Sequence, residues 1–507
     1  MADRFSSRRL FSGAVLLLCT LSARALTAQS ALADANRLLT DGQARLGGSP
    51  GKLLLNQPAR LGTPVTLAPG QDLLIGAPLT VGAASIRLSG HNDVRCTAPI
   101  TAENAMELFV AEGATDMAVH GCNVTVAGHP GGYLLTATRS ARIAMTDNHL
   151  VNMAIFNTHN VGGADSHSND VTLSGNSTEF PHGGGPIGIY LLYVLGGTVS
   201  KNHLQGTGHG VQWWGGDANE GWRGVAAVNG AGRLNITGNT CLNAGGACVW
   251  GSDGFDINVS GNTADTCSDV CFDTEGGVRT VFTNNTAKRC TNGCLAAEFE
   301  SQDAVFKGNT VEADGLIPEG PLVLIKHPSG RGPNHVNLSI TGNTLICAKM
   351  CAALYSEGED GFTFAKNTIT NGYLQFINYT NNVVISANTL HFNVPIEAAS
   401  GIAGPSLSNG HQSEISGNTI LAQAGAKGDG ACIAQSWSDY NNTDQMRITG
   451  NTCSGFRTGI VTATGGGNPG APHAVWLLQG NKLSGLPAAQ QIVHQHSSGN
   501  EQYQSLP

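Results

Sequence analysis

The sequence predicts an all-β protein, a single-domain right-handed parallel β-helix whose short coils stack as a solenoid. The first observation is a phrase of the form Ile-Thr-Gly-Asn-Thr that recurs after residue 140, with its asparagines 21 to 37 residues apart. The second is the alternation of apolar and polar residues before each asparagine, which is typical of a strand with one buried face. The third is the repeat length near 23 residues, which is too short for a strand, a crossover helix and two loops. It fits three short strands per coil, each coil burying its apolar face against its neighbours. A right-handed sense is the default for parallel strands joined by a crossover.

The recurring asparagines predict how one coil follows the next. The Gly-Asn step reads as a turn, because both residues tolerate the left-handed backbone region. Stacked coils lie about 4.8 Å apart, so equivalent asparagines are expected to form a hydrogen-bonded ladder. The clear copies contain Asn239, Asn262, Asn343 and Asn451, and the looser copies contain Asn148, Asn176, Asn202, Asn285, Asn309, Asn367, Asn388, Asn418 and Asn481.

These repeats, of the PbH1 type, resemble those of the pectate-lyase-like superfamily of right-handed parallel β-helix proteins. The recurring Gly-Asn-Thr turn covers residues 143–483, and residues 65–90 resemble the opening coil of such domains. The resemblance implies the fold. It does not specify a reaction, because it rests on turn and core residues.

The N-terminus predicts export. Residues 1–25 read as a signal peptide, with arginines, an apolar run over 10–21 and a cleavage motif at 23–25. Arg8 and Arg9 also resemble a twin-arginine signal, the alternative being an ordinary leader. Residues 26–60 are predicted to be an N-terminal cap segment with a short amphipathic helix over 29–46, residues 61–486 the β-helix, and residues 487–507 a C-terminal tail. No later apolar run is long enough to span a membrane, so a periplasmic or extracellular location is expected.

The charge of the chain argues about its binding partners, and its cysteines argue about disulfide bonds. The formal net charge is −9, and an acidic surface argues against binding to nucleic acid. Of the 13 cysteines only Cys19 lies in the predicted leader, and the even remainder in an oxidising compartment suggests disulfides. One alternative is pairing between adjacent coils, such as Cys267 with Cys290. Another is a zinc cluster, against which the lack of histidines at ligand spacing argues. The expected pairs are Cys96 with Cys122, Cys241 with Cys248, Cys267 with Cys271, Cys290 with Cys294, Cys347 with Cys351, and Cys432 with Cys453.

Counting from the asparagines aligns a row of chemically active side chains. Asp273 and Glu275 should point outward from one strand, about 7 Å apart. Glu298 lies as far after Asn285 as Glu275 lies after Asn262, so Glu298 should stack beside Glu275. In the preceding coils the outward positions hold Trp250 and Trp214, with Asp253 and Asp217 following them, and on the other side lie Lys326, His327, Arg331 and Tyr355.

The predicted cluster allows two kinds of chemistry. Stacked carboxylates repel, so at least one should have a raised pKa or the group should hold a cation. A neutral acid beside an ionised carboxylate is the arrangement of a glycosidase. Calcium held by Asp273, Glu275, Glu298 or Glu300, with Lys326 as base, would instead suit β-elimination of a uronic-acid polymer. Solvated surface charge is the third interpretation.

The aromatic residues near the cluster favour a carbohydrate ligand, since indoles stack on sugar faces. Trp214 has the outward parity, whereas Trp213 has the parity of the core. His209 lies in a Gly-His-Gly sequence, a short match that carries no mechanism. The sequence therefore predicts an exported polysaccharide-active enzyme, a polysaccharide lyase or a glycoside hydrolase, that binds a glycan along an outward groove. The alternative is a non-catalytic carbohydrate-binding or cell-surface β-helix.

Overall fold

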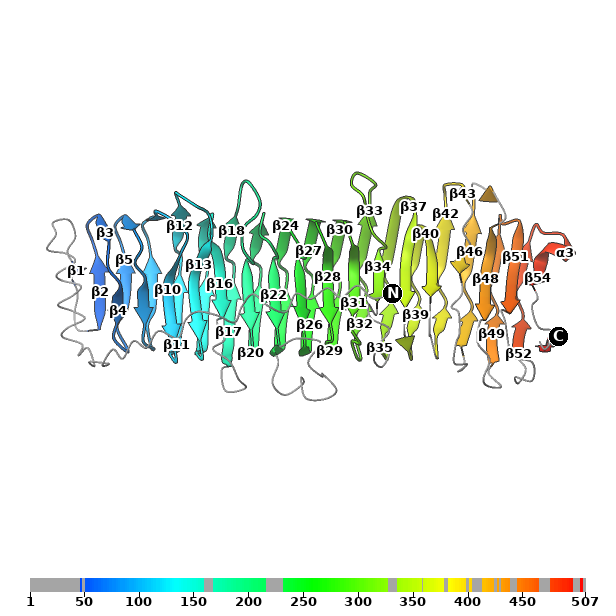
Figure 1. The fold of residues 1–507 in the computed structure, drawn as a ribbon, viewed down its shortest axis with the longest axis horizontal. Helices are drawn as coiled ribbons and strands as arrows, with labels where there is room; N and C mark the ends of the chain where they lie inside the picture. The colour runs from blue at the N-terminus through cyan, green and yellow to red at the C-terminus, as the bar shows by residue number, and fades with distance from the viewer. Residues whose placement is uncertain are drawn as a thin grey trace, which may run out of the picture.

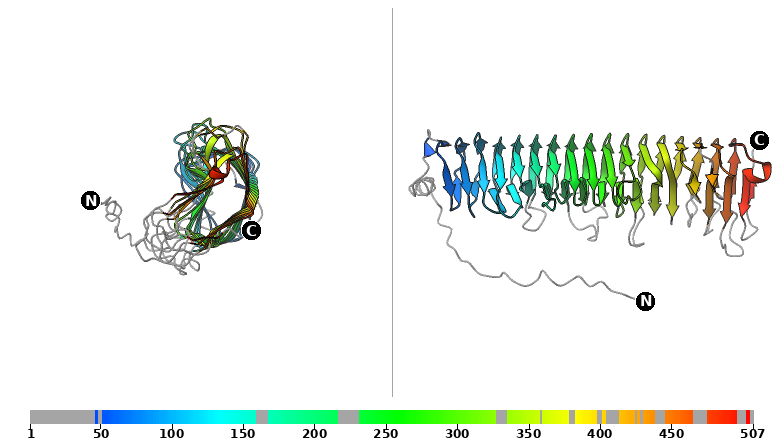
Figure 2. Two further views of the ribbon diagram at one scale, coloured as in Figure 1. Left: turned by 90° about the vertical axis from the view of Figure 1, so that its right-hand side faces the viewer. Right: turned by 90° about the horizontal axis from the view of Figure 1, so that it is seen from above.

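The computed structural model of the chain is one long stack of β-coils, with the N-terminal coils at one end and the C-terminal coils at the other (Figure 1). Viewed along the stack, the coils superimpose closely (Figure 2). The structure describes residues 46–47, 51–158, 167–215, 231–326, 335–357, 359–377, 382–397, 401–403, 413–423, 426–427, 430–437, 445–464, 475–495 and 502–504.

Each coil consists of three short strands. One coil contains β26 (Gly254–Ser260), β27 (Thr263–Cys267) and β28 (Val270–Glu275), and the next begins with β29 (Val278–Thr283). Every one of these strands pairs in parallel with its equivalent one coil later. The first strands of the coils belong to a 19-stranded sheet, and the other two sets belong to a 32-stranded sheet. This arrangement confirms the predicted all-β parallel β-helix.

One face of the stack carries the row of residues aligned from the sequence. This face is formed by the last strand of each coil, and its strands pair in parallel along the stack. The strands are β13 (Gly132–Thr138), β16 (Ala154–Thr158), β19 (Ile189–Leu192), β22 (Val211–Trp214), β25 (Val249–Ser252), β28, β31 (Gly293–Glu298), β34 (Val323–Lys326), β37 (Thr344–Glu357) and β40 (Thr368–Ile377).

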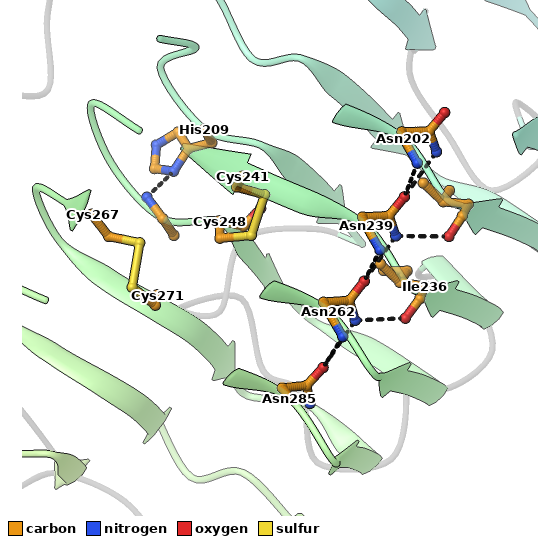
Figure 3. Close-up of a disulfide and its surroundings, with 12 residues drawn as sticks. Asn202, His209, Ile236, Asn239, Cys241, Cys248, Asn262, Cys267, Cys271 and Asn285 are labelled. Atoms are coloured by element: carbon orange, nitrogen blue, oxygen red, sulfur yellow. Dashed lines mark hydrogen bonds between the residues drawn. A yellow bond between two sulfur atoms is a disulfide. The ribbon is translucent and has the colours of Figure 1, made fainter. Parts of the chain in front are cut away.

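A hydrogen-bonded ladder of asparagines connects the coils (Figure 3). The side-chain amide of Asn239 donates to Oδ1 of Asn262 at 2.9 Å and to the carbonyl oxygen of Val199 at 2.9 Å. The backbone N–H of Asn239 donates to the same Oδ1 at 2.9 Å. The pattern continues from Asn148 to Asn481. The predicted ladder is thereby confirmed, and it satisfies polar groups that would be costly to bury alone.

The left-handed residue of each turn is the one before the ladder asparagine. Gly238 has φ of 62° and Gly261 has φ of 63°, and in other coils Lys201 and Asn284 take the same role, each with φ of 54°. The ladder asparagines themselves do not have positive φ. The expectation that the asparagine also uses the left-handed region is therefore wrong: its amide is required for the ladder, and glycine provides the turn without strain.

The inside of the stack is a continuous apolar core. Trp213 and Phe272 are completely buried, in agreement with their inward parity. Aromatic rings also stack between coils, as Phe282 does on Phe306 with ring centroids 4.9 Å apart. Because inward positions alternate with outward ones, burial of Phe272 and Thr274 directs Asp273 and Glu275 away from the core.

The β-helix extends past both predicted boundaries. β2 (Lys52–Leu55) and β3 (Ala59–Leu61) pair in parallel with β5 (Asp72–Ile75) and β6 (Leu79–Val81), so coil structure precedes residue 61. After residue 486, α3 (Ala488–Gln491) leads into β54 (Ile492–Gln495), which pairs with β51 (Thr458–Thr464). The predicted signal peptide, and the cap helix up to residue 45, lie outside the described residues. Within the described residues no helix is long and apolar enough to cross a membrane.

Candidate functional site

The strand register brings Glu275, Glu298 and Lys326 side by side. Glu275 of β28 pairs with Glu298 of β31, and Glu298 pairs with Lys326 of β34. Ser252 of β25 occupies the same column one coil before Glu275. Adjacent strands are about 4.8 Å apart, so the two glutamates and the lysine project from three successive coils as the sequence predicted.

Asp273 belongs to the neighbouring outward column and is almost completely buried. Its side chain is 4% exposed, and its Oδ1 makes no hydrogen bond to any described residue. Burial raises the pKa of Asp273 well above its usual range, and the nearby Glu275, Glu298 and Asp269 raise it further. The protonated form of Asp273 is therefore favoured over the charged form, compared with an ordinary aspartate.

A small apolar patch includes the residue that pairs with Asp273 in the next coil. Val270, Ala296 and Leu324 form a separate small cluster, and Tyr355 packs against it. Ala296 pairs with Asp273, and Leu324 pairs with both Ala296 and Tyr355. Ala296, Leu324 and Tyr355 thus follow Asp273 along its column, so its neighbour in the next coil is apolar. The Tyr355 hydroxyl donates to Oε2 of Glu357 at 3.4 Å.

Glu275 titrates near neutral pH. Burial is the largest cause and, together with Glu298, Asp269 and Asp253, raises the pKa of Glu275 to about 7, although the Trp250 side chain acts in the opposite direction as a hydrogen-bond donor. A carboxyl group with this pKa holds a proton part of the time at physiological pH. It can therefore both donate and accept a proton.

Glu298 is placed so that its charged form is supported. Burial raises the pKa of Glu298, but the positive charge of Lys326 lowers it, and Asp269 raises it slightly. Lys326 is exposed at the end of β34. Of the two aligned glutamates, Glu298 is the one whose paired position in the next coil holds a cation.

Asp269 is a member of the cluster that the sequence analysis did not identify. It precedes β28, and its Oδ1 accepts a hydrogen bond from Nδ2 of Asn292 at 3.0 Å. Its charge raises the pKa values of Asp273, Glu275 and Glu298. Asp269 lies in a bend rather than in a strand, so counting outward positions along strands cannot find it.

Three aromatic side chains lie beside the carboxyl groups. The His209 ring stacks on Trp250 with centroids 5.3 Å apart, and Trp214 lies 5.7 Å from Trp250. Nδ1 of His209 accepts a hydrogen bond from the backbone N–H of Ala247 at 2.9 Å (Figure 3). The ring proton must then be on Nε2, and burial lowers the pKa of His209. His209 is therefore a neutral group with a fixed tautomer, a role that its short motif did not reveal.

Short disulfides span the bends that lead into the strands of the site or, in β37, a segment of the strand itself. Cys241 pairs with Cys248, Cys267 with Cys271, Cys290 with Cys294, and Cys347 with Cys351. Cys96–Cys122 and Cys432–Cys453 join adjacent coils elsewhere. All six expected pairs are present, and the alternative of Cys267 bonded to Cys290 is not adopted. Trp250, Asp273 and Glu298 each follow one of these short bridges.

The other residues proposed for the site are placed differently. Asp253 is 3% exposed and lies in a left-handed bend after β25, where it raises the pKa of Glu275. Glu300 lies past the end of β31, in a second left-handed bend, and so does not continue the outward alternation of that strand. Asp217, His327 and Arg331 lie outside the described residues.

The predicted calcium site stays a prediction. Among the described residues, no group of three or more His, Cys, Asp or Glu side chains has an arrangement suited to hold a metal ion. Asp273, Glu275 and Glu298 are brought together, but the burial of Asp273 favours its protonated form, which is a poor calcium ligand.

Comparisons with known proteins return distant structural likenesses. Bacteriophage CBA120 tailspike protein 3 is 12% identical with a TM-score of 0.34, and the alignment covers 92% of this chain but only 60% of the tailspike. A PL6 alginate lyase in complex with a trisaccharide is 11% identical with a TM-score of 0.33, covering 72% of this chain and 83% of the lyase. The A-module of the Azotobacter vinelandii mannuronan C-5 epimerase AlgE6 is 12% identical with a TM-score of 0.28, covering 94% and 95%.

No protein-family model matches the chain, and no curated protein matches it. The strand register, rather than these likenesses, establishes the parallel β-helix. What the protein does has to be argued from the site.

Proposed function

We propose that this protein is an exported glycoside hydrolase that acts on a neutral polysaccharide, with Glu275 and Glu298 as its reacting carboxyl groups. The observation that carries the proposal is the register of Glu275 with Glu298, in a cluster whose pKa values are raised to different extents. Two carboxyl groups held in different protonation states are what glycosidic bond cleavage requires.

The two glutamates have different environments and therefore different roles. Glu275, with a pKa of about 7, is the general acid that protonates the leaving glycosidic oxygen. Glu298, supported by the positive charge of Lys326, is the ionised carboxylate that attacks the anomeric carbon and forms a glycosyl ester. Water then attacks the same carbon, Glu275 takes the proton of that water, and Glu298 leaves as a carboxylate.

The short separation of the two backbones favours this double displacement. Residues paired across adjacent parallel strands are about 4.8 Å apart. Retaining enzymes place their carboxyl groups about 5–5.5 Å apart, whereas inverting enzymes leave about 6.5–9.5 Å for a water molecule. We therefore expect the product to keep the anomeric configuration of the substrate.

The local charge favours a neutral glycan over a uronic-acid polymer. Asp269, Asp273, Glu275 and Glu298 lie together, and Lys326 is the cation that acts on this group. The negative charge would repel a polyanionic substrate unless a metal ion bridged the two. A neutral sugar needs no such bridge, and Trp250 and Trp214 offer apolar faces on which it can stack. Lyase chemistry, which the sequence left equally open, is thus the less suited of the two.

Six disulfides agree with an oxidising compartment. They support export to the periplasm or the cell exterior as part of the proposal. Together with the acidic composition they fit a protein that meets glycans rather than nucleic acid.

A panel of polysaccharides separates the alternatives. The protein is incubated with neutral and uronic-acid glycans, with and without a chelator, and both new reducing ends and the absorbance of unsaturated uronates are followed. The proposal expects reducing ends from a neutral glycan, unaffected by the chelator and without absorbance. Absorbance that disappears with the chelator would identify a calcium-dependent lyase. Binding without either signal would identify the non-catalytic carbohydrate-binding alternative.

A further inference from the structure

The outward column that contains Asp273 continues toward the N-terminus as a row of polar and aromatic side chains. Trp250 precedes Asp273 in this column, because Val249 pairs with Phe272. Gln212 pairs with Trp250, Tyr190 with Gln212, Asn157 with Tyr190, and Thr136 with Asn157. We refer to Thr136, Asn157, Tyr190 and Gln212 as the N-terminal strip. The strip and the two residues after it extend over five strand spacings, or about 24 Å.

The N-terminal strip contains polar atoms that no described residue satisfies. Thr136 and Gln212 are each 4% exposed and Asn157 is 9% exposed. Oγ1 of Thr136 and Oε1 of Gln212 make no hydrogen bond to any described residue. A buried polar group without a partner destabilises the folded protein by about 1–3 kcal/mol. Both side chains project from the outer side of the sheet, since their neighbours Leu135 and Trp213 fill the core.

The same column has a different character on the other side of the carboxyl groups. After Asp273 it continues with Ala296 and Leu324, which belong to the apolar patch covered by Tyr355. These residues offer no hydrogen-bonding side chain on the two coils that follow Asp273. Within two coils of Asp273, the side chains of this column that can hydrogen-bond to a hydroxylated ligand thus lie on its N-terminal side.

The aromatic members of the strip suit an uncharged, hydroxylated ligand. Tyr190 is half-buried, and burial raises its pKa. Burial also raises the pKa of the nearby Tyr133 to about 12. Both phenols therefore stay protonated, and they can stack on a sugar and exchange hydrogen bonds with its hydroxyl groups.

We infer that the N-terminal strip binds several consecutive units of a linear neutral glycan, so that the glycan extends from the carboxyl groups toward the N-terminal coils. This inference rests on the proposed function, and it adds the position, the direction and the minimum length of the substrate. Glycan hydroxyl groups supply the partners that Thr136 and Gln212 lack, after rotation about the last side-chain bond of Gln212, which is soft.

Substitutions of nearly equal size separate ligand binding from a structural role. Gln212→Leu and Thr136→Val remove the unsatisfied oxygen atoms and keep most of the volume. Because these atoms have no partner among the described residues, their removal should leave the melting temperature unchanged or raise it. Binding of a long glycan should weaken by about tenfold for each, the equivalent of one lost hydrogen bond. Gln375→Leu is the matched control, since Gln375 follows Tyr355 in the same column on the C-terminal side.

The ligands for this test are cello-, xylo-, manno- and laminari-oligosaccharides from disaccharide to hexasaccharide. Binding is measured by calorimetry with the wild-type protein, the two strip variants and the control, separately from any assay of cleavage. We expect affinity to increase with length in the wild type, and this increase to be lost in the strip variants but retained in Gln375→Leu.

Three results would overturn the inference: affinity independent of length, equal weakening by Gln375→Leu, or a wild-type protein that binds none of these sugars. Length-dependent binding without cleavage would instead contradict the proposed hydrolase function but would agree with glycan binding by the strip. Cleavage that does not depend on glycan length or on Gln212 would contradict glycan binding by the strip but would agree with the proposed hydrolase function.

Discussion

Glu275 and Glu298 face outward at paired positions of two adjacent coils, and Lys326 occupies the same position one coil further on. Burial raises the pKa values of both glutamates, but only for Glu298 is the charge of Lys326 a main opposing influence. Two side chains of the same type thus have different electrostatic surroundings, and the first two predictions below follow from this difference.

Glu298→Gln should abolish turnover, with a loss of at least about a hundredfold, because a neutral amide cannot act as the ionised carboxylate. Its melting temperature should stay the same or increase slightly, because the substitution removes one of several carboxyl groups that repel one another. Glu414→Gln, on a strand of the 19-stranded sheet away from the site, is the matched control and should keep full activity. Large destabilisation with activity retained would show that Glu298 has a structural role instead.

The stability of the protein should decrease as the pH rises through the range in which Glu275 titrates. The folded state holds the Glu275 proton up to a pKa of about 7, against an ordinary 4.5. Between these two values the folded protein binds more protons than the unfolded chain, so the free energy of unfolding falls as pH rises. The full shift corresponds to at most about 3 kcal/mol.

Glu275→Gln tests this dependence, because glutamine resembles the protonated acid at every pH. Urea unfolding of wild type and variant at several pH values from about 4.5 to about 8 should show a shallower slope for the variant. The Glu414→Gln control should follow the wild type. Identical slopes for Glu275→Gln and wild type would mean that another group carries the effect.

Hydrolysis should proceed with retention of configuration. Nuclear magnetic resonance of the first products, recorded before mutarotation, distinguishes the two anomers directly. Retention agrees with an attack by Glu298 followed by a second displacement by water. If the inverted anomer forms first, the pair of reacting groups must be more widely separated, and Asp273 with Glu298 or Glu275 becomes the pair to examine.

Breaking the asparagine ladder in its middle should lower the free energy of unfolding more than breaking it at its end. Asn309→Ala removes the side chain that accepts from Asn285 and donates to both Asn343 and the carbonyl of Phe282. Several buried groups lose their partners, and we expect a loss of about 2–5 kcal/mol in the free energy of unfolding. Asn481→Ala, at the partly exposed end of the ladder, should cost less than half as much. Equal losses would show that the ladder does not act as a connected network.

The repeat made the fold and the register of the site predictable. Alternation showed which residues face outward, and counting from Asn262 and Asn285 aligned Glu275 with Glu298 as the structure has them. The surroundings of these residues were not predictable in the same way. Asp273 has outward parity, but parity does not reveal that its side chain is almost completely buried or that an apolar patch lies next to it.

The residues in bends were also not predictable from the periodicity of the sequence. Asp269 lies in a bend, and His209 stacks on Trp250 from the bend before β22. Their positions depend on how loops fold over the sheet, which a pattern of alternating residues does not encode. The same holds for Glu300, a possible calcium ligand in the sequence analysis, which lies in a left-handed bend past the end of its strand.

The short disulfides have a consequence for how the protein responds to a reductant. The bridges before β28 and β31 each close a loop with a sequence separation of only 4, so they restrict the unfolded chain much less than a bridge across a long loop would. The rod itself is held by its ladder and its core, whereas the bridges fix the shape of the bends from which Asp273 and Glu298 emerge. Mild reduction should therefore separate two properties that usually fail together, with the site losing its geometry while the solenoid stays folded.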